Sequence, residues 1–100
     1  MYSVLIVDDT VENLDILTEV LKDEYNIKVA INGAMALKVA EKTLPDIILL
    51  DIMMPDMDGF SLCNTLRRKY KFPIIFVTAK VEDIDKINGL SIGADDYVTK

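Results

Sequence analysis

The chain contains three short, unbroken runs of large apolar residues, at residues 4–7, 47–50 and 74–77. Runs of this length, bounded by turn-forming residues, are typical of strands buried on both faces of a sheet. The clearest run leads directly into Asp51 and then into a turn with proline and glycine that ends at Gly59. The last run belongs to a strand expected over residues 73–79, in which proline is confined to the first position.

Two weaker strands are predicted beside these three. Ile27, Val29 and Ile31 alternate with polar or small residues, a pattern typical of a half-exposed strand at the edge of a sheet. Residues 96–100 begin a further strand. The sequence therefore predicts a sheet with three buried strands and two weaker ones.

Apolar residues at helical spacing fill the intervals between these strands. The first helix is expected over residues 11–23, with Asp9 or Thr10 placed to cap it. It carries a stripe of apolar residues that we expect to be buried: Val11, Leu14, Leu17, Val20 and Leu21. Further helices are expected over residues 34–43, 60–70 and 82–92.

Strand and helix thus alternate along the chain until the final strand. Regular alternation with short links predicts an α/β fold, in which a parallel sheet is covered by helices on both faces. We expect one domain over residues 1–100, because a chain of this length has room for one hydrophobic core.

Charge and composition limit the function. The net charge is −6 and the pI about 4.5, which argues against direct binding to nucleic acid. Histidine is absent, so the chain has no histidine base, zinc ligand or phosphoryl carrier. Cys63 is the single cysteine and is expected to be a buried thiol. No apolar run is long enough to cross a bilayer and no leader opens the chain, so we expect a cytoplasmic protein without membrane contact.

The predicted strands end in residues that carry chemistry. Asp8 and Asp9 follow the first strand, Asp51 ends the third, and Thr78 lies near the end of the fourth. Because the carboxyl ends of parallel strands lie at one edge of the sheet, we expect these side chains to form one pocket with Lys100 from the fifth strand. Alone, each has an ordinary explanation as a helix cap, a strand residue or a solvated charge.

Together, these residues favour a phosphoryl-transfer site. Three converging carboxylates repel one another unless a cation lies among them, and hard oxygen ligands suit Mg²⁺. Asp51 is the natural oxygen nucleophile, which would form an acyl phosphate. The hydroxyl of Thr78 and the ammonium group of Lys100 would stabilise the transferring phosphoryl group.

Over its whole length the sequence resembles the receiver domains of two-component response regulators. The motifs that carry the resemblance are Val7-Asp8-Asp9, Leu50-Asp51-Ile52-Met53-Met54-Pro55, Asp58-Gly59, Thr78-Ala79, Gly93-Ala94-Asp95-Asp96-Tyr97 and Lys100. The resemblance implies a flavodoxin-like, doubly wound parallel sheet of five strands in the order 2-1-3-4-5. Family members continue with a fifth helix that is absent from this chain. We therefore expect apolar side chains of the third, fourth and fifth strands to be exposed as an association surface, for example in a homodimer.

The resemblance also implies a role for each matching residue. Asp51 corresponds to the phosphoacceptor and Lys100 to the cation that neutralises phosphoryl charge. The implied ligands of Mg²⁺ or Mn²⁺ are Asp8, Asp9, Asp51 and the backbone carbonyl of Met53, with Asp8 acting largely through water. The implied switch residues are Thr78, Ala79 and Tyr97. Met53 and Lys80 match positions at which the family tunes the lifetime of the acyl phosphate.

The implied function is a phosphorylation-activated signalling switch. A sensor histidine kinase or a phosphotransfer protein would donate a phosphoryl group to Asp51 in a Mg²⁺-dependent reaction. The modified domain would then signal to an output domain beyond residue 100 or to a separate effector. We expect a phosphoacceptor that assists its own phosphorylation and dephosphorylation, not a turnover enzyme.

Other interpretations fit the residues less well. The main alternative is a phosphorylation-independent pseudo-receiver that only binds partners. An aspartate-nucleophile phosphatase needs a second acid where Met53 stands, and a flavodoxin-like cofactor binder needs a phosphate loop where Asp8 and Asp9 stand. A calcium loop that uses Asp56-Met57-Asp58-Gly59 would have Met54 at its first ligand position and Thr65 at its last.

Overall fold

The strands and helices of the computed structural model follow the alternation predicted from the sequence. The structure describes residues 2–51, 59–70, 73–78 and 96–99. In these ranges it contains β1 (Ser3–Val7), α1 (Val11–Leu21), β2 (Asn26–Ala30), α2 (Gly33–Thr43), β3 (Ile47–Asp51), α3 (Gly59–Lys69), β4 (Ile74–Thr78) and β5 (Asp96–Thr99). The helix predicted over residues 82–92 lies outside the described residues.

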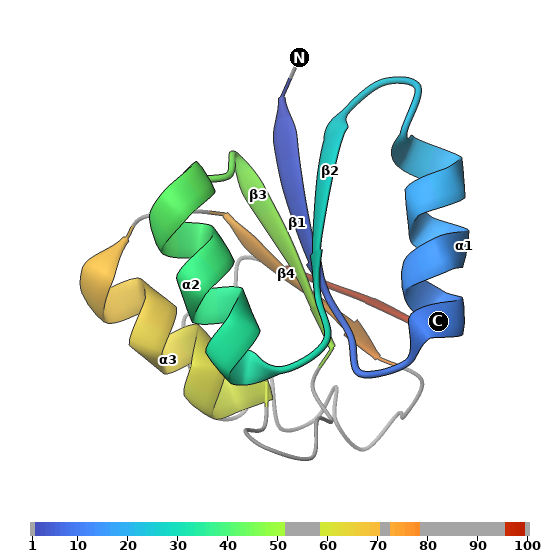
Figure 1. Cartoon of the computed structure of the whole chain (residues 1–100). Coiled ribbons are helices and arrows are strands. Elements are labelled where there is room, and N and C mark those ends of the chain that lie inside the picture. Colours follow the sequence, from blue (N-terminus) through green and yellow to red (C-terminus); the bar gives the residue numbers. More distant parts are fainter. Residues whose placement is uncertain (1, 52–58, 71–72, 79–95, 100) are drawn as a thin grey trace.

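The strands form one parallel sheet of five strands in the order β2-β1-β3-β4-β5. This order confirms the predicted doubly wound α/β fold (Figure 1). The three strands predicted from unbroken apolar runs, β1, β3 and β4, are the interior strands, and the alternating strand β2 lies at an edge. Each strand therefore occupies the position that its apolar pattern indicates.

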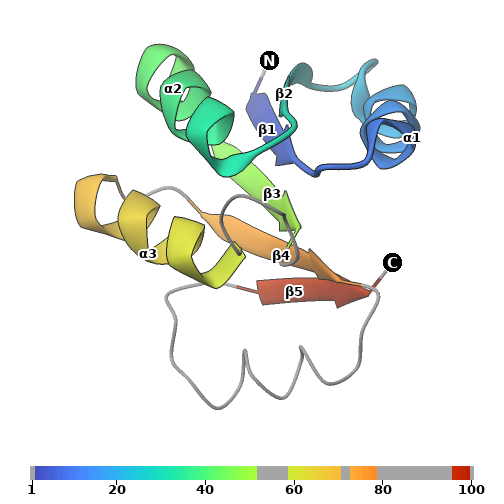
Figure 2. The same cartoon turned by 60° about the horizontal axis from the view of Figure 1, so that its bottom comes forward.

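The sheet separates two layers of helices. In both views α2 and α3 lie on one face of the sheet and α1 lies on the other (Figures 1 and 2). The larger core fills the space between the sheet and the pair α2 and α3. Its buried residues are alternate residues of the interior strands, small residues at the end of β2 and in α2, and the inward face of α3: Leu5, Val7, Ala30, Ala36, Ala40, Ile48, Leu50, Leu62, Cys63, Leu66, Ile74 and Phe76.

The helices on this face match their predicted limits to within one residue. Asn32 caps α2 through its side-chain oxygen, which accepts a hydrogen bond from the backbone N–H of Met35 at 2.8 Å. Cys63 is a buried thiol in α3, as expected. Among the helices that the structure describes, none has both the length and the apolar character needed to cross a membrane.

The stripe predicted for α1 is wrong at two of its positions. Leu14 is buried against Val4 and Ile6 of β1, but Val11 and Val20 are 60% and 71% exposed. At 3.6 residues per turn, Val11 lies roughly 60° and Val20 roughly 120° around the helix from Leu14, on opposite sides of it. The helix touches the sheet along a narrower strip than its apolar pattern covers, and it ends at Leu21, two residues earlier than predicted.

Apolar residues of β3 and β4 on the α1 side are covered in part. Ile47 and Leu49 pack against the core beneath α1, and Ile75 is the register partner of Leu49. Strand alternation places Val77 on the same face as Ile75. All four residues are half-buried, so the expectation that this face of β3 and β4 is exposed holds only in part.

Candidate functional site

The register between β1 and β3 brings two aspartates to the same edge of the sheet. Val7 pairs with Leu50 in the last described step of this register. Asp8 and Asp51 are the next residues along their chains, so both reach the carboxyl edge side by side. Because side chains alternate along a strand, Asp8 and Asp51 continue the α1-side rows of their two strands.

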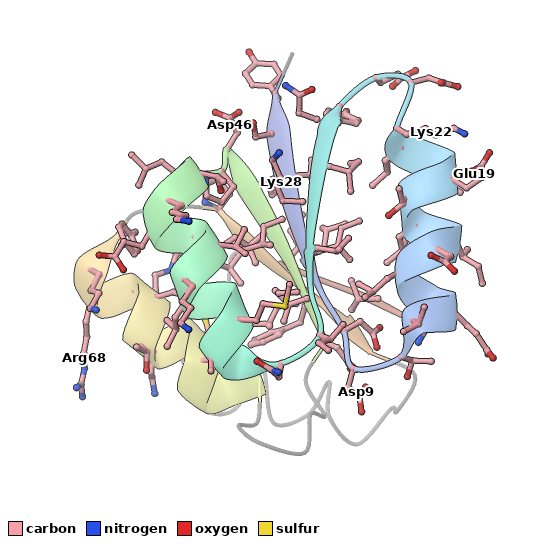
Figure 3. The ribbon with its side chains drawn as sticks, in the orientation of Figure 1. Asp9, Glu19, Lys22, Lys28, Asp46 and Arg68 are labelled. Atoms are coloured by element: carbon pink, nitrogen blue, oxygen red, sulfur yellow. The ribbon has the colours of Figure 1, made fainter. Side chains whose placement is uncertain are left out.

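Three carboxylates converge at this edge. Asp8, Asp9 and Asp51 each offer an oxygen, and these oxygens all lie within 4.8 Å of one another. Asp8 is 2% exposed and Asp51 is 8% exposed, whereas Asp9 is exposed and lies in the turn between β1 and α1 (Figure 3). The structure therefore brings together the acidic cluster that the sequence predicted, with two carboxylates inside and one facing solvent.

Asp8 is held by hydrogen bonds from both sides. Its backbone N–H donates to the carbonyl of Ala30 at 3.1 Å, which extends the β1–β2 ladder by one residue. Its Oδ1 accepts from the backbone N–H of Thr10 at 2.9 Å, and its Oδ2 accepts from Nδ2 of Asn13 at 3.2 Å. The carboxylate of Asp8 is thus fixed by the first turn of α1.

This arrangement corrects the predicted cap of the first helix. Thr10 occupies the N-cap position of α1, but its side chain makes no capping hydrogen bond. The hydroxyl of Thr10 instead donates to Oδ1 of Asp9 at 3.4 Å. The sequence did not reveal the contribution of Asn13; the only signal was a side-chain amide one turn into a helix that follows an acidic pair.

The donor set fits a hard divalent cation. Mg²⁺ is bound in proteins by a few carboxylates together with water and substrate oxygens. Two of the carboxylates here are buried, and such groups need compensating partners. Asp8, Asp9 and Asp51 would hold the ion, and the exposure of Asp9 leaves that side of the cluster open to solvent.

The remaining predicted residues are placed only by their backbone or not at all. Asp51 pairs with Val77 in β4, so Thr78 lies one position beyond this pair, at the carboxyl end of its strand. Thr78 is the partner of Thr99, and Tyr97 is the partner of Phe76. Met53, Ala79, Lys80 and Lys100 lie outside the described residues.

Comparisons with known proteins identify the relatives of this chain. Residues 4–100 match the sequence model of the response regulator receiver domain. The regulatory protein VanRc of Enterococcus gallinarum is 45% identical over 98 residues, which are 97% of this chain and 42% of that protein. The chain thus spans less than half the length of this relative.

Solved structures share the same fold. The chemotaxis protein CheY4 of Vibrio cholerae superposes with a TM-score of 0.91 at 34% identity, over 100% of this chain and 87% of that chain. A two-component response regulator of Clostridium difficile has a TM-score of 0.92 at 32% identity, over 100% and 84% of the two chains. The BeF3-activated receiver domain of RstA from Klebsiella pneumoniae has a TM-score of 0.89 at 34% identity, over 98% and 85%.

Proposed function

This chain belongs to the response regulator receiver domain family, and on that premise we propose that it is a phosphorylation-activated signalling switch. The phosphoacceptor is Asp51. The observation that carries the proposal is the convergence of Asp8, Asp9 and Asp51 within 4.8 Å at the carboxyl edge of the sheet. A structural ion pair or a helix cap would need no such gathering of like charges, which costs free energy unless a cation is present.

Asp51 is the best-placed nucleophile of the three. It ends the central strand β3, pairs with Val77 of β4 and is 8% exposed, so the sheet holds its backbone in place. A carboxylate oxygen of Asp51 attacks the phosphorus of a phosphohistidine on a sensor histidine kinase or phosphotransfer protein. The N–P bond breaks with its electron pair left on the imidazole, and the new O–P bond forms an acyl phosphate.

The other two carboxylates serve the metal that this reaction needs. Asp8, Asp9 and Asp51, with the backbone carbonyl of Met53, are the proposed ligands of Mg²⁺ or Mn²⁺. When bound, the ion neutralises charge on the phosphoryl oxygens. Asp8 contributes fixed negative charge from inside the fold, and the exposed Asp9 borders the side from which a phosphodonor approaches.

The signal leaves the site through the neighbouring strands. Thr78 and the backbone N–H of Ala79 are the proposed contacts of the new phosphoryl group, with Tyr97 turning inward and Lys100 neutralising charge. The register supports this role for β4 and β5, since Thr78 lies one step beyond the partner of Asp51. An output domain beyond residue 100 or a separate effector reads the change.

The proposed role is that of a phosphoacceptor rather than a turnover enzyme. The chain assists its own phosphorylation and dephosphorylation, and Met53 stands where an aspartate-based phosphatase would carry its second acid. We place the domain in the cytoplasm, which agrees with the buried thiol of Cys63.

Labelling with a small phosphodonor tests the proposal. Acetyl phosphate with Mg²⁺ should add one phosphoryl group to the protein, detected by intact mass, and EDTA should prevent it. Asp51→Asn should abolish the label. Asp46→Asn is the matched control, because Asp46 precedes the same strand at the opposite edge of the sheet. Equal labelling of Asp51→Asn would remove Asp51 from this role, and no labelling of the unsubstituted protein would favour a phosphorylation-independent interaction module.

A further inference from the structure

We propose that Asn13 is a positioning residue for the metal site: its side-chain amide sets the orientation of the Asp8 carboxylate and thereby the affinity for Mg²⁺. This inference rests on the proposed function. It concerns a residue outside the three carboxylates, in the first turn of a helix that the proposed reaction does not otherwise use.

The first step of the argument is geometric. Nδ2 of Asn13 donates to Oδ2 of Asp8 at 3.2 Å, and the backbone N–H of Thr10 donates to Oδ1 at 2.9 Å. One donor therefore lies on each oxygen of the same carboxylate. Since the backbone N–H of Asp8 is itself bonded to Ala30, both the main chain and the side chain of Asp8 are held, and rotation of the carboxylate requires that a hydrogen bond be broken.

The second step concerns charge. Asp8 is 2% exposed, and a buried carboxylate needs hydrogen bonds to offset the loss of water. The two donors named here are neutral amides, so they satisfy the oxygens without cancelling the negative charge. A lysine or arginine at position 13 would occupy the same oxygen but would also repel a divalent cation. Asn13 is thus suited to orient Asp8 while its charge remains available to Mg²⁺.

The third step concerns the helix itself. Asparagine is a poorer helix former than alanine because its side chain competes for backbone hydrogen bonds. Asn13 nevertheless lies within α1 and is half-buried. A polar side chain that is half-buried needs a hydrogen-bond partner, and the bond to Asp8 is that contact.

A role confined to holding α1 against β1 would give a different result from a positioning role. Loss of a structural bond lowers the stability of the protein and leaves the metal affinity of the folded state unchanged. Loss of a positioning bond weakens the metal affinity of the folded state, since partners that orient ligands typically contribute about ten-fold or more to affinity. The two roles are separated when the affinity is measured at a temperature at which every variant is folded.

The test is a Mg²⁺ titration followed through backbone amide shifts by NMR, with folding verified by circular dichroism. Asn13→Ala and Asn13→Leu, which lack the donor, should raise the Mg²⁺ dissociation constant about ten-fold. Asn13→Gln, which keeps an amide, should recover much of the affinity. Asn64→Ala is the matched control, because Asn64 is an exposed asparagine within α3; its dissociation constant should equal that of the unsubstituted protein.

A second readout follows labelling of Asp51 by acetyl phosphate. The Mg²⁺ concentration for half-maximal rate should shift upward in Asn13→Ala, whereas the rate at saturating Mg²⁺ should approach that of the unsubstituted protein. A lower rate at every Mg²⁺ concentration with no shift would overturn the positioning role.

The outcomes also distinguish this inference from the proposed function. If the unsubstituted protein does not bind Mg²⁺, the proposed function itself fails. If it binds Mg²⁺ and folded Asn13→Ala binds within two-fold of it, only the role of Asn13 fails. If neither Asn13→Ala nor Asn13→Leu folds, hydrogen exchange of the Asn13 side-chain amide is measured in the unsubstituted protein. This amide should stay protected from exchange as Mg²⁺ is added. Loss of that protection would overturn the inference.

Discussion

Ser3 and Asp46 are joined by two reciprocal hydrogen bonds at the amino edge of the sheet. The backbone N–H of Ser3 donates to Oδ2 of Asp46 at 2.6 Å, and the backbone N–H of Asp46 donates to the carbonyl of Ser3 at 2.9 Å. The register that follows this pair leads to Asp8 and Asp51 at the other edge. One strand pair therefore carries a stabilising carboxylate contact at one edge and a costly convergence of carboxylates at the other.

Substitution of Asp46 should destabilise the fold without affecting the site. Asp46→Ala removes the charged acceptor of the Ser3 N–H, which is worth about 1 kcal/mol at an exposed position. The free energy of unfolding in urea should fall by about that amount with an unchanged m-value. Asp23→Ala, at an exposed aspartate after α1, should leave it within about 0.5 kcal/mol. Equal stabilities of the two variants, or a loss of Mg²⁺ binding in Asp46→Ala, would contradict this account.

Divalent cations should raise the stability of the protein. The three carboxylates lie within 4.8 Å only when the chain is folded, so Mg²⁺ binds the native state in preference to the unfolded chain. At a hundred-fold excess over the dissociation constant, the free energy of unfolding should rise by about 2.7 kcal/mol. Thermal melts in Mg²⁺ and in KCl of equal ionic strength measure this difference. The same melting temperature in both salts would argue against a metal site.

Neutralisation of Asp9 should change the melting temperature in opposite directions with and without the metal. Without divalent ions, Asp9→Asn removes one of three like charges, so the melting temperature should rise slightly at low ionic strength. The gain should shrink in concentrated salt, because screening already weakens repulsion at this exposed position. With Mg²⁺, the variant should melt below the unsubstituted protein, since a ligand is lost. A lower melting temperature of Asp9→Asn in EDTA would show that other contacts of Asp9 outweigh its repulsion by Asp8 and Asp51.

The parallel fold and the acidic cluster were predictable because strand and helix alternate along the chain, whereas the strand order was implied only by the resemblance to receiver domains. Unbroken apolar runs located β1, β3 and β4, and a parallel sheet brings all its carboxyl ends to one edge. Asp9 and Asp51 are far apart in the sequence, yet no side-chain detail was needed to predict that they meet. This inference depends only on the direction of the strands.

Features that depend on local backbone geometry were not predictable in this way. The bond from Asn13 to Asp8 depends on the path of the chain through the turn that enters α1. The exposure of Val11 and Val20 depends on how narrow a strip of α1 touches the sheet, whereas apolar spacing alone describes a wider stripe. Periodicity thus identified the buried side of α1 but not its width.

Truncation of Leu14 and of Val20 should show how wide a strip of α1 is buried against the sheet. Leu14 is 4% exposed, and Leu14→Ala should cost about 2–5 kcal/mol through lost contacts and a residual cavity. Val20→Ala should change the free energy of unfolding by no more than about 0.5 kcal/mol, because its side chain is already in solvent and alanine favours a helix. Urea unfolding of both variants gives the comparison. A cost above about 1 kcal/mol for Val20→Ala would mean that Val20 is covered in solution.

Leu44 should be a position at which glycine stabilises the protein. Leu44 follows α2 in the left-handed conformation, with φ 44° and ψ 66°, and its N–H donates to the carbonyl of Ala40 at 3.0 Å. A side chain with a Cβ is strained in this region, whereas glycine adopts it freely. Leu44 is 60% exposed, so its removal sacrifices little burial. We expect Leu44→Gly to raise the free energy of unfolding by about 0.5–1 kcal/mol, after the greater freedom of glycine in the unfolded chain is subtracted.

The matched variant Leu44→Ala separates strain from side-chain loss. Alanine removes nearly the same part of the side chain as glycine does but keeps the Cβ, so it should retain the strain and show no gain. Urea unfolding of the three proteins measures both effects on one scale. If Leu44→Gly and Leu44→Ala have equal stability, the left-handed turn at the end of α2 carries no strain that glycine relieves, and the exposed leucine would then be explained by its contacts alone.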